Sequence, residues 1–353
     1  MLFIFGYIQN ELINFPEKNE PVHLTAGFLL YNPNIPVRNQ MKKILIVDDL
    51  HENIFPMLSE LGFEVNYQPN INRSEILEII KDFEGLIIRS KTKIDKDFLS
   101  YADKLEFIGR AGAGLDLIDI EEVSRKNIQV FAANEGNADA VAEHTMGMIL
   151  MLFNKLNYAD SEVRQSIWER EKNRGIELRG MTVGIIGYGN MGKALAERLI
   201  GFGVIVLAYD KEEKGLSKEG FLASKASMKE IFEETDLLSV HVPLTLETRM
   251  MINDDFIQKF RKNIFIVNTS RGEVACTESI LKGLQSGKVR GACLDVLENE
   301  KFTTLTLKQE AVYSQLFKLK NVILTPHIAG WTVESYRKIN EVLIEKIRGM
   351  LSK

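Results

Sequence analysis

The chain has 353 residues, of which 45% are apolar and 26% charged, so it has room for about two domains of ordinary globular composition. A formal net charge of −5 argues against a broad basic face for nucleic acid. The longest apolar runs, such as Met146 to Phe153, are about half as long as a membrane span. Two cysteines, Cys276 and Cys293, cannot form a disulfide framework, and no metal-ligand spacing is present. We expect a compact, soluble, cytoplasmic protein that acts on a small molecule and binds no metal, nucleic acid or membrane.

Residues 1–40 differ from the rest of the chain. An apolar start at Leu2 to Phe5 is followed by a stretch rich in Pro and Asn, without a helix or strand period. No Lys or Arg precedes the apolar run and no small-residue cleavage site follows it, so the segment does not resemble a signal peptide. We expect a disordered leader or a mis-assigned start, because the first buried strand begins only after Met41.

From Met41 onward, short apolar runs alternate with amphipathic stretches, which is typical of parallel sheets covered by helices. A long helix is expected between two such series, at 138–158, where it would form the back wall of a cleft between two domains. The fold class is therefore α/β with two doubly wound parallel-sheet domains. The expected strands are 41–48, 85–88, 105–109 and 128–131 in the first series, and 181–186, 204–209, 237–242, 264–268, 291–296 and 322–325 in the second.

The strongest motif is GxGxxG at 187–192, which follows an expected strand and opens an expected helix at 193–200. Its glycines permit a tight turn and close approach of a pyrophosphate to free N–H groups at the helix start. Asp210 ends the next strand, where a carboxylate accepts hydrogen bonds from a ribose and disfavours a 2′-phosphate. NAD is thus favoured over NADP, although Lys211 and Lys214 lie close by. The alternative is a packing turn beside a surface carboxylate.

Hydride transfer at a carbinol carbon needs a general acid/base, and five histidines are candidates. His23 lies in the leader, His51 lies outside the domain with the fingerprint, and His144 lies within the long helix, where a capping or core role is expected. His241 and His327 both stand at carboxyl ends of strands, the edge at which open α/β sheets bind ligands. The pattern does not separate these two.

The same edge rule selects Arg271, within the segment 268–272, because a guanidinium offers a planar fork that matches a substrate carboxylate. The alternative is a solvated loop charge. Glu298 and Glu300 follow the strand that ends near Asp295, and each is a candidate partner for an imidazole, whose tautomer a neighbouring carboxylate determines.

These residues lie in motifs that resemble the D-isomer-specific 2-hydroxyacid dehydrogenases over nearly the whole chain from Met41 to about Ile347. The motifs occur in the family's order: Gly109 to Asp116, Ala142-Glu143-His144, the GxGxxG, His241 to Thr245, Asn268 to Gly272, Leu294-Asp295-Val296, and Thr325 to Gly330.

The resemblance implies roles for individual residues. Arg271 binds the substrate, His327 is the acid/base and Glu300 supports it, although the Glu-Pro that often follows in the family is Lys301-Phe302 here. Backbone N–H groups around Ala113 and Gly114 receive the substrate carboxylate. The residues implied for the cofactor are Gly187, Gly189, Asn190, Met191, Gly192, Asp210, His241, Pro243, Thr245, Thr269 and Asp295.

The resemblance also implies a split topology. A flavodoxin-like substrate domain takes 41–140 and 328–353, and a Rossmann NAD domain takes 141–327 and is inserted in it, with cleft closure excluding water. Homodimers through the cofactor domain are usual in the family, so a homodimer is expected. The chain ends soon after His327, so we expect no C-terminal regulatory domain and no feedback through one.

Substrate choice is expected to depend on Arg89, whose guanidinium, with the Ser90 and Thr92 hydroxyls, suits a phosphate dianion. An ordinary strand-to-helix turn is the alternative. Arg170 and Arg174 either add charge to this pocket across a dimer or lie on a solvated face. The segment resembles the branch that oxidises 3-phospho-D-glycerate to 3-phosphohydroxypyruvate with NAD, in L-serine biosynthesis. Hydroxypyruvate or glyoxylate reductases, D-lactate dehydrogenases and NAD-sensing corepressors of the same fold are the alternatives.

Overall fold

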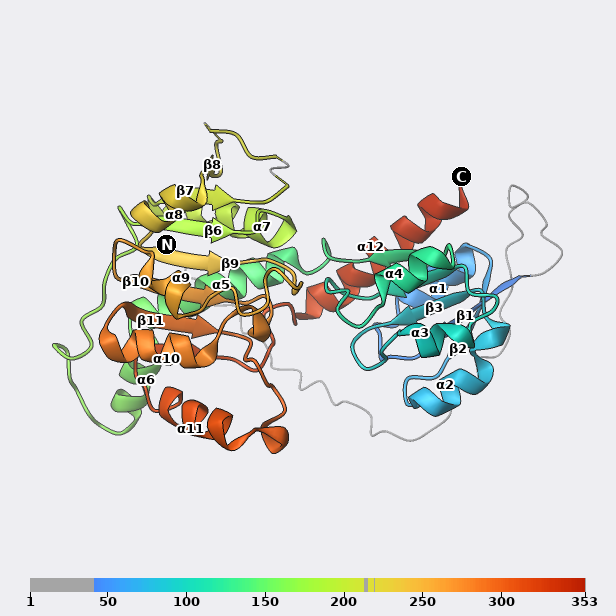
Figure 1. Cartoon of the computed structure of the whole chain (residues 1–353), viewed down its shortest axis with the longest axis horizontal. Coiled ribbons are helices and arrows are strands. Elements are labelled where there is room, and N and C mark those ends of the chain that lie inside the picture. The colour runs from blue at the N-terminus through green and yellow to red at the C-terminus, as the bar shows by residue number, and fades with distance from the viewer. Residues whose placement is uncertain (1–40, 213–214, 219, 353) are drawn as a thin grey trace, which may run out of the picture. The chain divides into compact units, whose positions relative to one another are not determined.

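A computed structural model describes residues 41–212, 215–218 and 220–352 of the chain. The expectation for residues 1–40, a disordered leader or a mis-assigned start, lies outside the described residues. The described part forms two sheets, one of five and one of seven strands, and every strand pair in them is parallel. Figure 1 shows the first sheet in blue to green and the second in yellow-green to red. The predicted α/β class is confirmed.

The first sheet has the strand order β2-β1-β3-β4-β5, which is the flavodoxin-like doubly wound order. Its last helix, α12, comes from the far end of the chain and packs on α1, β4 and β5. Four apolar residues of α12, among them Leu343, join the core under this sheet. The elements are β1 (Lys42–Ile46), α1 (Ile54–Glu60), β2 (Phe63–Tyr67), α2 (Arg73–Ile79), β3 (Gly85–Ile88), α3 (Lys96–Ser100), β4 (Phe107–Arg110), α4 (Ile120–Arg125), β5 (Gln129–Ala132) and α12 (Val333–Leu351).

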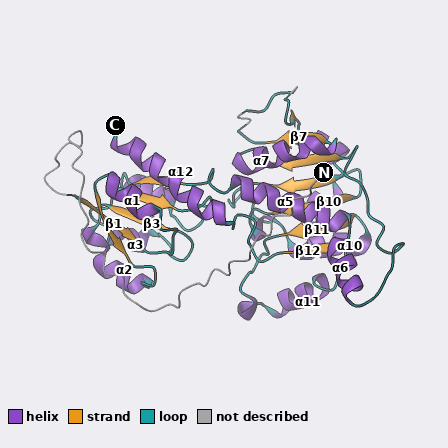
Figure 2. Cartoon of the chain, turned by 180° about the vertical axis from the view of Figure 1, so that it is seen from behind, coloured by secondary structure: helices purple, strands orange, loops and turns teal. Residues whose placement is uncertain are grey.

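The second sheet has the order β12-β11-β10-β9-β6-β7-β8, in which the chain starts at the centre, runs to one edge and then fills the other side. This is the Rossmann order extended by one strand. The elements are α5 (Ala138–Phe153), α6 (Leu156–Arg164), β6 (Thr182–Ile186), α7 (Asn190–Leu199), β7 (Ile205–Tyr209), β8 (Ser224–Lys225), α8 (Met228–Glu234), β9 (Leu237–Val240), α9 (Asp254–Gln258), β10 (Ile264–Asn268), α10 (Thr277–Ser286), β11 (Val289–Leu294), α11 (Leu307–Leu316) and β12 (Val322–Leu324). Figure 2 distinguishes the strands from the helices that cover them.

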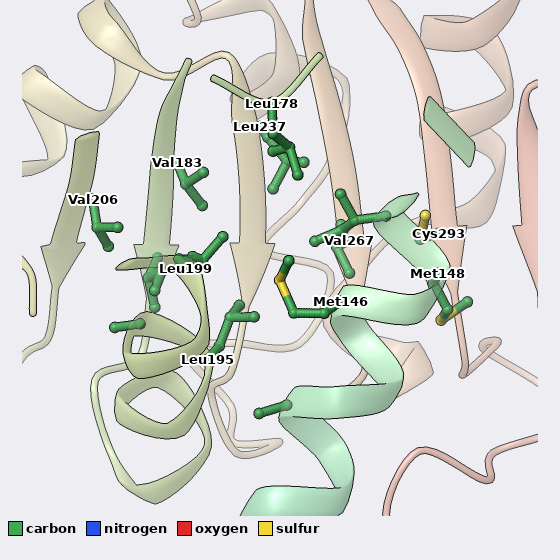
Figure 3. Packing of buried hydrophobic residues seen from close by; sticks show 14 of the residues in the cluster. Met146, Met148, Leu178, Val183, Leu195, Leu199, Val206, Leu237, Val267 and Cys293 are labelled. Atoms are coloured by element: carbon green, nitrogen blue, oxygen red, sulfur yellow. The ribbon is translucent and has the colours of Figure 1, made fainter. Parts of the chain in front are cut away.

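Both faces of the seven-stranded sheet are buried. Along β10, Phe265 and Val267 belong to one apolar cluster, while Ile264 and Ile266 belong to another on the opposite face. Side chains of α5 and α7 fill the first cluster, as Figure 3 shows for the helix residues Met146 and Leu195 beside strand residues. Double-sided burial explains why these strands are continuous apolar runs that sequence patterns detect.

The sequence analysis needs three local corrections, one for a helix and two for strands that it did not identify. The helix expected at 138–158 is two helices, because the chain turns at Lys155, whose φ of 52° is left-handed. The sequence analysis also missed the edge strands β2 and β8. The outer strand β2 has one buried residue, Phe63, and includes the exposed Glu64 and Asn66, so it lacks the apolar run that marks an inner strand.

The described strands up to Ala132 belong to the first sheet and those from Thr182 to Leu324 to the second. The domain limits at residues 140 and 327 stay a prediction. Within the described residues, no helix combines the length and apolarity needed to cross a membrane.

Candidate active site

The glycine motif forms the turn between β6 and α7. Gly187 has a φ of 92°, and a Cβ on it would lie 2.4 Å from the His241 carbonyl oxygen. The helix begins at Asn190, and its N-cap, Gly189, has no side chain to occupy the first N–H groups. A Cβ at Gly189 would have no atom within 4 Å, so the backbone there has open space around it. Free donors at a helix start with room beside them fit the pyrophosphate of a dinucleotide.

Asp210 follows β7 and is fixed by two backbone donors. Its Oδ2 accepts a hydrogen bond from Tyr188 N at 2.7 Å, and its Oδ1 accepts one from Glu212 N at 2.9 Å. Each carboxylate oxygen retains a further lone pair for a ribose hydroxyl. Lys211 pairs with Glu247 at 2.7 Å, and Lys214 lies outside the described residues. The geometry therefore fits an unphosphorylated ribose, in line with NAD.

His241 lies directly after β9, next to the glycine turn. Its Nε2 is 2.9 Å from Ser239 Oγ, and its backbone N–H donates to Ile186 O. Burial lowers the pKa of His241 to about 4, so the imidazole is neutral near pH 7. A neutral, half-buried histidine beside the turn suits a cofactor-pocket residue better than a proton carrier.

His327 is the other candidate, and its ring is accessible. Its side chain is 45% exposed, and Nδ1 lies 3.0 Å from the Glu300 carboxylate. A carboxylate can only accept, so Nδ1 carries the proton and Nε2 is the nitrogen available to a substrate. The structure thus brings Glu300 to His327 despite the unusual Lys301-Phe302 that follows. Glu298, the other candidate, instead accepts from the Thr277 backbone N–H.

The turn that carries His327 is organised around Asp295, whose side chain is buried. One carboxylate oxygen accepts from Thr325 Oγ1 at 2.6 Å and Ile328 N at 2.9 Å, and the other accepts from Ala329 N at 2.9 Å. His327 itself has a φ of 55°, which is costly for a non-glycine residue. The hydrogen bonds to Asp295 hold this conformation. Contact of Asp295 with a nicotinamide stays a prediction.

His144, as expected, has a structural partner, because its Nε2 lies 3.0 Å from Thr325 Oγ1. Thr269 is buried, and its hydroxyl lies 3.2 Å from that of Thr145. Pro243 and Thr245 belong to a turn closed by the Thr248 hydroxyl, which donates to the Pro243 carbonyl.

Arg271 is held from both sides. Its Nε donates to Asp116 Oδ2 at 2.8 Å and its Nη1 donates to Ser270 O at 2.7 Å. Asn268 braces the turn, because its amide donates to Arg271 O and its oxygen accepts from Ser270. A Cβ at Gly114 would lie 1.6 Å from Arg271 Nη2. The guanidinium therefore lies directly on the Gly114 backbone, and the alternative of a solvated loop charge is wrong.

A second cationic group lies at the carboxyl ends of β3 and β4. The Arg89 backbone N–H donates to Asp48 Oδ2 at 2.6 Å, while its guanidinium lies over the Trp331 ring at 3.7 Å. Burial is the main cause that lowers the pKa of Arg89. Ser90 is exposed and Thr92 is buried. Their part in an anion site stays a prediction.

Arg110 is a residue that the sequence analysis did not single out. Its Nη1 donates to Ala111 O at 2.7 Å, but its buried Nε has no hydrogen-bond partner in the described structure. Burial, followed by the positive charge of Arg271, lowers the pKa of Arg110 to about 10. Arg89 and Asp48 also act on it electrostatically. A signal was available, since Arg110 ends a buried strand at the ligand-binding edge, as Arg271 nearly does.

Arg170 and Arg174 lie on an exposed segment, and their contribution to the pocket across a dimer stays a prediction. Arg174 is exposed and pairs with Glu171, and Arg170 is exposed. The described residues contain no cluster of His, Cys, Asp and Glu that could hold a metal ion.

The fold and these groups together define a dinucleotide-binding α/β protein in which a histidine paired with a glutamate and several arginines lie at the carboxyl ends of the strands. Residues 146–329 match the family described as D-isomer specific 2-hydroxyacid dehydrogenase, NAD binding domain. The chain belongs to this family, and NAD is its cofactor.

Individual relatives carry different activities in their names. A D-3-phosphoglycerate dehydrogenase of Methanocaldococcus jannaschii is 35% identical over 88% of this chain, which spans 58% of that relative's length. A hydroxypyruvate reductase of Thermotoga maritima is 36% identical over 79% of this chain and 88% of its own. The crystal structure of a D-lactate dehydrogenase from Aquifex aeolicus, complexed with NAD and lactic acid, has a TM-score of 0.72 at 27% identity, covering 88% of this chain and 95% of its own.

Proposed function

We propose that the protein oxidises 3-phospho-D-glycerate to 3-phosphohydroxypyruvate with NAD, the reaction that opens L-serine biosynthesis. The observation that carries the proposal is the Arg89 guanidinium. Among the described residues it has no hydrogen-bond or ion-pair partner, and the buried Arg110 adds positive charge to its surroundings. Neither cation forms an ion pair, although Asp48 acts electrostatically on both, and two such cations favour a doubly charged anion. The names of the phosphoglycerate dehydrogenases among the relatives support the same substrate.

The remaining groups have complementary roles in this reaction. Arg271 binds the substrate carboxylate together with the backbone at Gly114, and its fork polarises the C2 oxygen. His327 takes the proton of the C2 hydroxyl on Nε2, while Glu300 holds the Nδ1 proton and stabilises the imidazolium. NAD, when bound, supplies the acceptor for the C2 hydride. In the reverse direction, His327 returns the proton to the carbonyl oxygen.

A second candidate is reduction of hydroxypyruvate or glyoxylate. It is favoured by the relative of Thermotoga maritima, of which this chain covers 88%. The same acid/base pair and the same Arg271 serve that reaction, so the two functions differ only in whether a phosphate is recognised. A homodimer, which is usual in the family, and a cytoplasmic location, which the lack of a disulfide framework favours, are further parts of the proposal.

The test is NADH oxidation with 3-phosphohydroxypyruvate, hydroxypyruvate and pyruvate in parallel, for the wild type and Arg89→Ala. We expect 3-phosphohydroxypyruvate to be preferred. Arg89→Ala should lower its kcat/KM roughly tenfold to a hundredfold, the value of charged hydrogen bonds, and leave hydroxypyruvate unchanged. Arg125→Ala, which removes an exposed cation of α4, is the matched control. Equal use of hydroxypyruvate, with no effect of Arg89→Ala, would transfer the assignment to the reductase.

A further inference from the structure

The surroundings of Arg89 are aromatic. Its guanidinium carbon lies 3.7 Å from the centre of the Trp331 ring and 5.6 Å from that of Tyr336. The two rings lie 5.2 Å apart at an interplanar angle of 56°. An aromatic face attracts a cation through its quadrupole, and Trp does so best. The rings of Trp331, just before α12, and Tyr336, in its first turns, therefore hold the guanidinium of Arg89, which directly follows β3.

Stacking leaves the hydrogen-bonding capacity of the guanidinium intact. The five N–H groups lie in the plane of the fork, whereas the ring occupies its face. Within the described part of the chain, no carboxylate lies within 4 Å of the Arg89 guanidinium, and none of its N–H groups is used. A carboxylate partner would cancel the charge and compete with an incoming anion. An aromatic partner orients the cation and does neither.

Both rings are themselves held in place. The Tyr336 hydroxyl donates to Asp49 Oδ2 at 2.9 Å, and the Tyr67 hydroxyl donates to the other oxygen of Asp49 at 3.1 Å. The Trp331 backbone N–H donates to Ile328 O at 2.9 Å, within the turn that carries His327. The support for Arg89 is thus continuous with the segment of the acid/base residue.

We propose that Trp331 is a specificity-determining residue: its ring holds the Arg89 guanidinium flat, so that the free edge of the fork binds the phosphate of the substrate. The inference rests on the proposed function, because it assigns the phosphate to Arg89. Trp331 acts through Arg89 and is a positioning residue. Its effect therefore falls on the KM for phosphorylated substrates, whereas kcat and the use of unphosphorylated acids stay unchanged.

The first experiment compares Trp331→Leu and Trp331→Phe with the wild type. For Trp331→Leu we expect the KM for 3-phosphohydroxypyruvate to rise about threefold to thirtyfold, the range of a cation–π contact, with the kcat/KM for hydroxypyruvate unchanged. Trp331→Phe keeps an aromatic face and should recover most of the loss. Trp168→Leu removes the other tryptophan of the chain, whose side chain is exposed, and is the matched control.

The second experiment needs no turnover. Trp331 is the sole tryptophan in the Trp168→Phe variant, because the chain has 2 tryptophans. Titration of this variant with 3-phosphoglycerate should give a saturable change of tryptophan fluorescence. D-Glycerate at the same concentrations should give none, and adding Arg89→Met should abolish the response. A response that survives Arg89→Met would overturn the inference even if Trp331→Leu failed to fold.

The outcomes separate the inference from the function on which it rests. If Arg89→Ala removes the preference for the phosphorylated acid but Trp331→Leu leaves it intact, the stacking role is wrong and the phosphoglycerate assignment stands. If neither variant changes the preference, the stacking role and the phosphoglycerate assignment are both wrong. If both variants lose the preference, and the double variant Arg89→Ala/Trp331→Leu loses no more of it than Arg89→Ala alone, the stacking role and the phosphoglycerate assignment are both supported.

Discussion

Charged groups at the carboxyl ends of the two sheets have different kinds of partner. At the seven-stranded sheet, Asp295 accepts from three donors, Glu300 pairs with His327, and Asn268 braces the turn of Arg271. At the five-stranded sheet, the Arg89 guanidinium rests on aromatic rings, and the buried Nε of Arg110 has no partner in the described structure.

This difference separates two tasks. Groups that move a proton must keep one orientation, so the protein surrounds them with hydrogen bonds. The two proposed phosphate-binding cations, Arg89 and Arg110, form no ion pair in the described structure, whereas Arg271, the proposed ligand of the substrate carboxylate, pairs with Asp116. Unpaired cations lower the stability of the protein, and we propose that the edge of the five-stranded sheet keeps them in order to bind an anion. Three substitutions test the two halves of this comparison.

The largest effect is expected for His327→Gln, which removes the proposed proton carrier. We expect kcat to fall roughly a hundredfold to ten-thousandfold, whereas the dissociation constant of NADH should hardly change. Steady-state kinetics and fluorescence titration of NADH measure the two quantities. His241, with its pKa near 4, is a poor replacement. Unchanged turnover would nevertheless move the acid/base role away from His327, with His241 examined next.

An intermediate effect is expected for Asp295→Asn. The amide nitrogen of the new asparagine would replace a carboxylate oxygen and face a hydrogen-bond donor. Buried groups in the turn of His327 would then lack a partner. We expect a loss of about 1–3 kcal/mol in the free energy of unfolding, together with a lower kcat. Urea denaturation gives the first value. Asp254→Asn, at an exposed ion pair with Lys282, should stay within about 0.5 kcal/mol of the wild type. Similar losses in the two variants would contradict the role of Asp295.

The smallest effect has the opposite sign. Arg110→Met removes a buried cation that lies near Arg271, so the free energy of unfolding should rise by about 1 kcal/mol while the KM for the phosphorylated acid increases. Arg198→Met is the matched control, because Arg198 pairs with Asp139 and Glu143 and its loss should destabilise the protein. If thermal unfolding shows both variants destabilised alike, the idea that Arg110 is an unpaired, destabilising cation at the edge of the five-stranded sheet is wrong.

Much of the fold was predictable because its signals are local. The inner strands are apolar on both faces, so β10 was located to the residue at Ile264–Asn268. The edge strand β2 was missed since only one of its residues, Phe63, is buried. The break at Lys155 lacks Pro and Gly, so no local signal in the sequence marks its left-handed backbone.

By itself, the amino-acid sequence determined the glycine turn, the acidic residue after β7 and the order of motifs that carries Arg271, Glu300 and His327. Each depends on residues close together in the chain. Tertiary structure alone decided that His241 is half-buried with a lowered pKa and that the His327 ring is accessible, because burial depends on every segment packed around a ring. It also decided that Arg89 rests on Trp331, since no local pattern relates a strand of the first sheet to the start of the last helix.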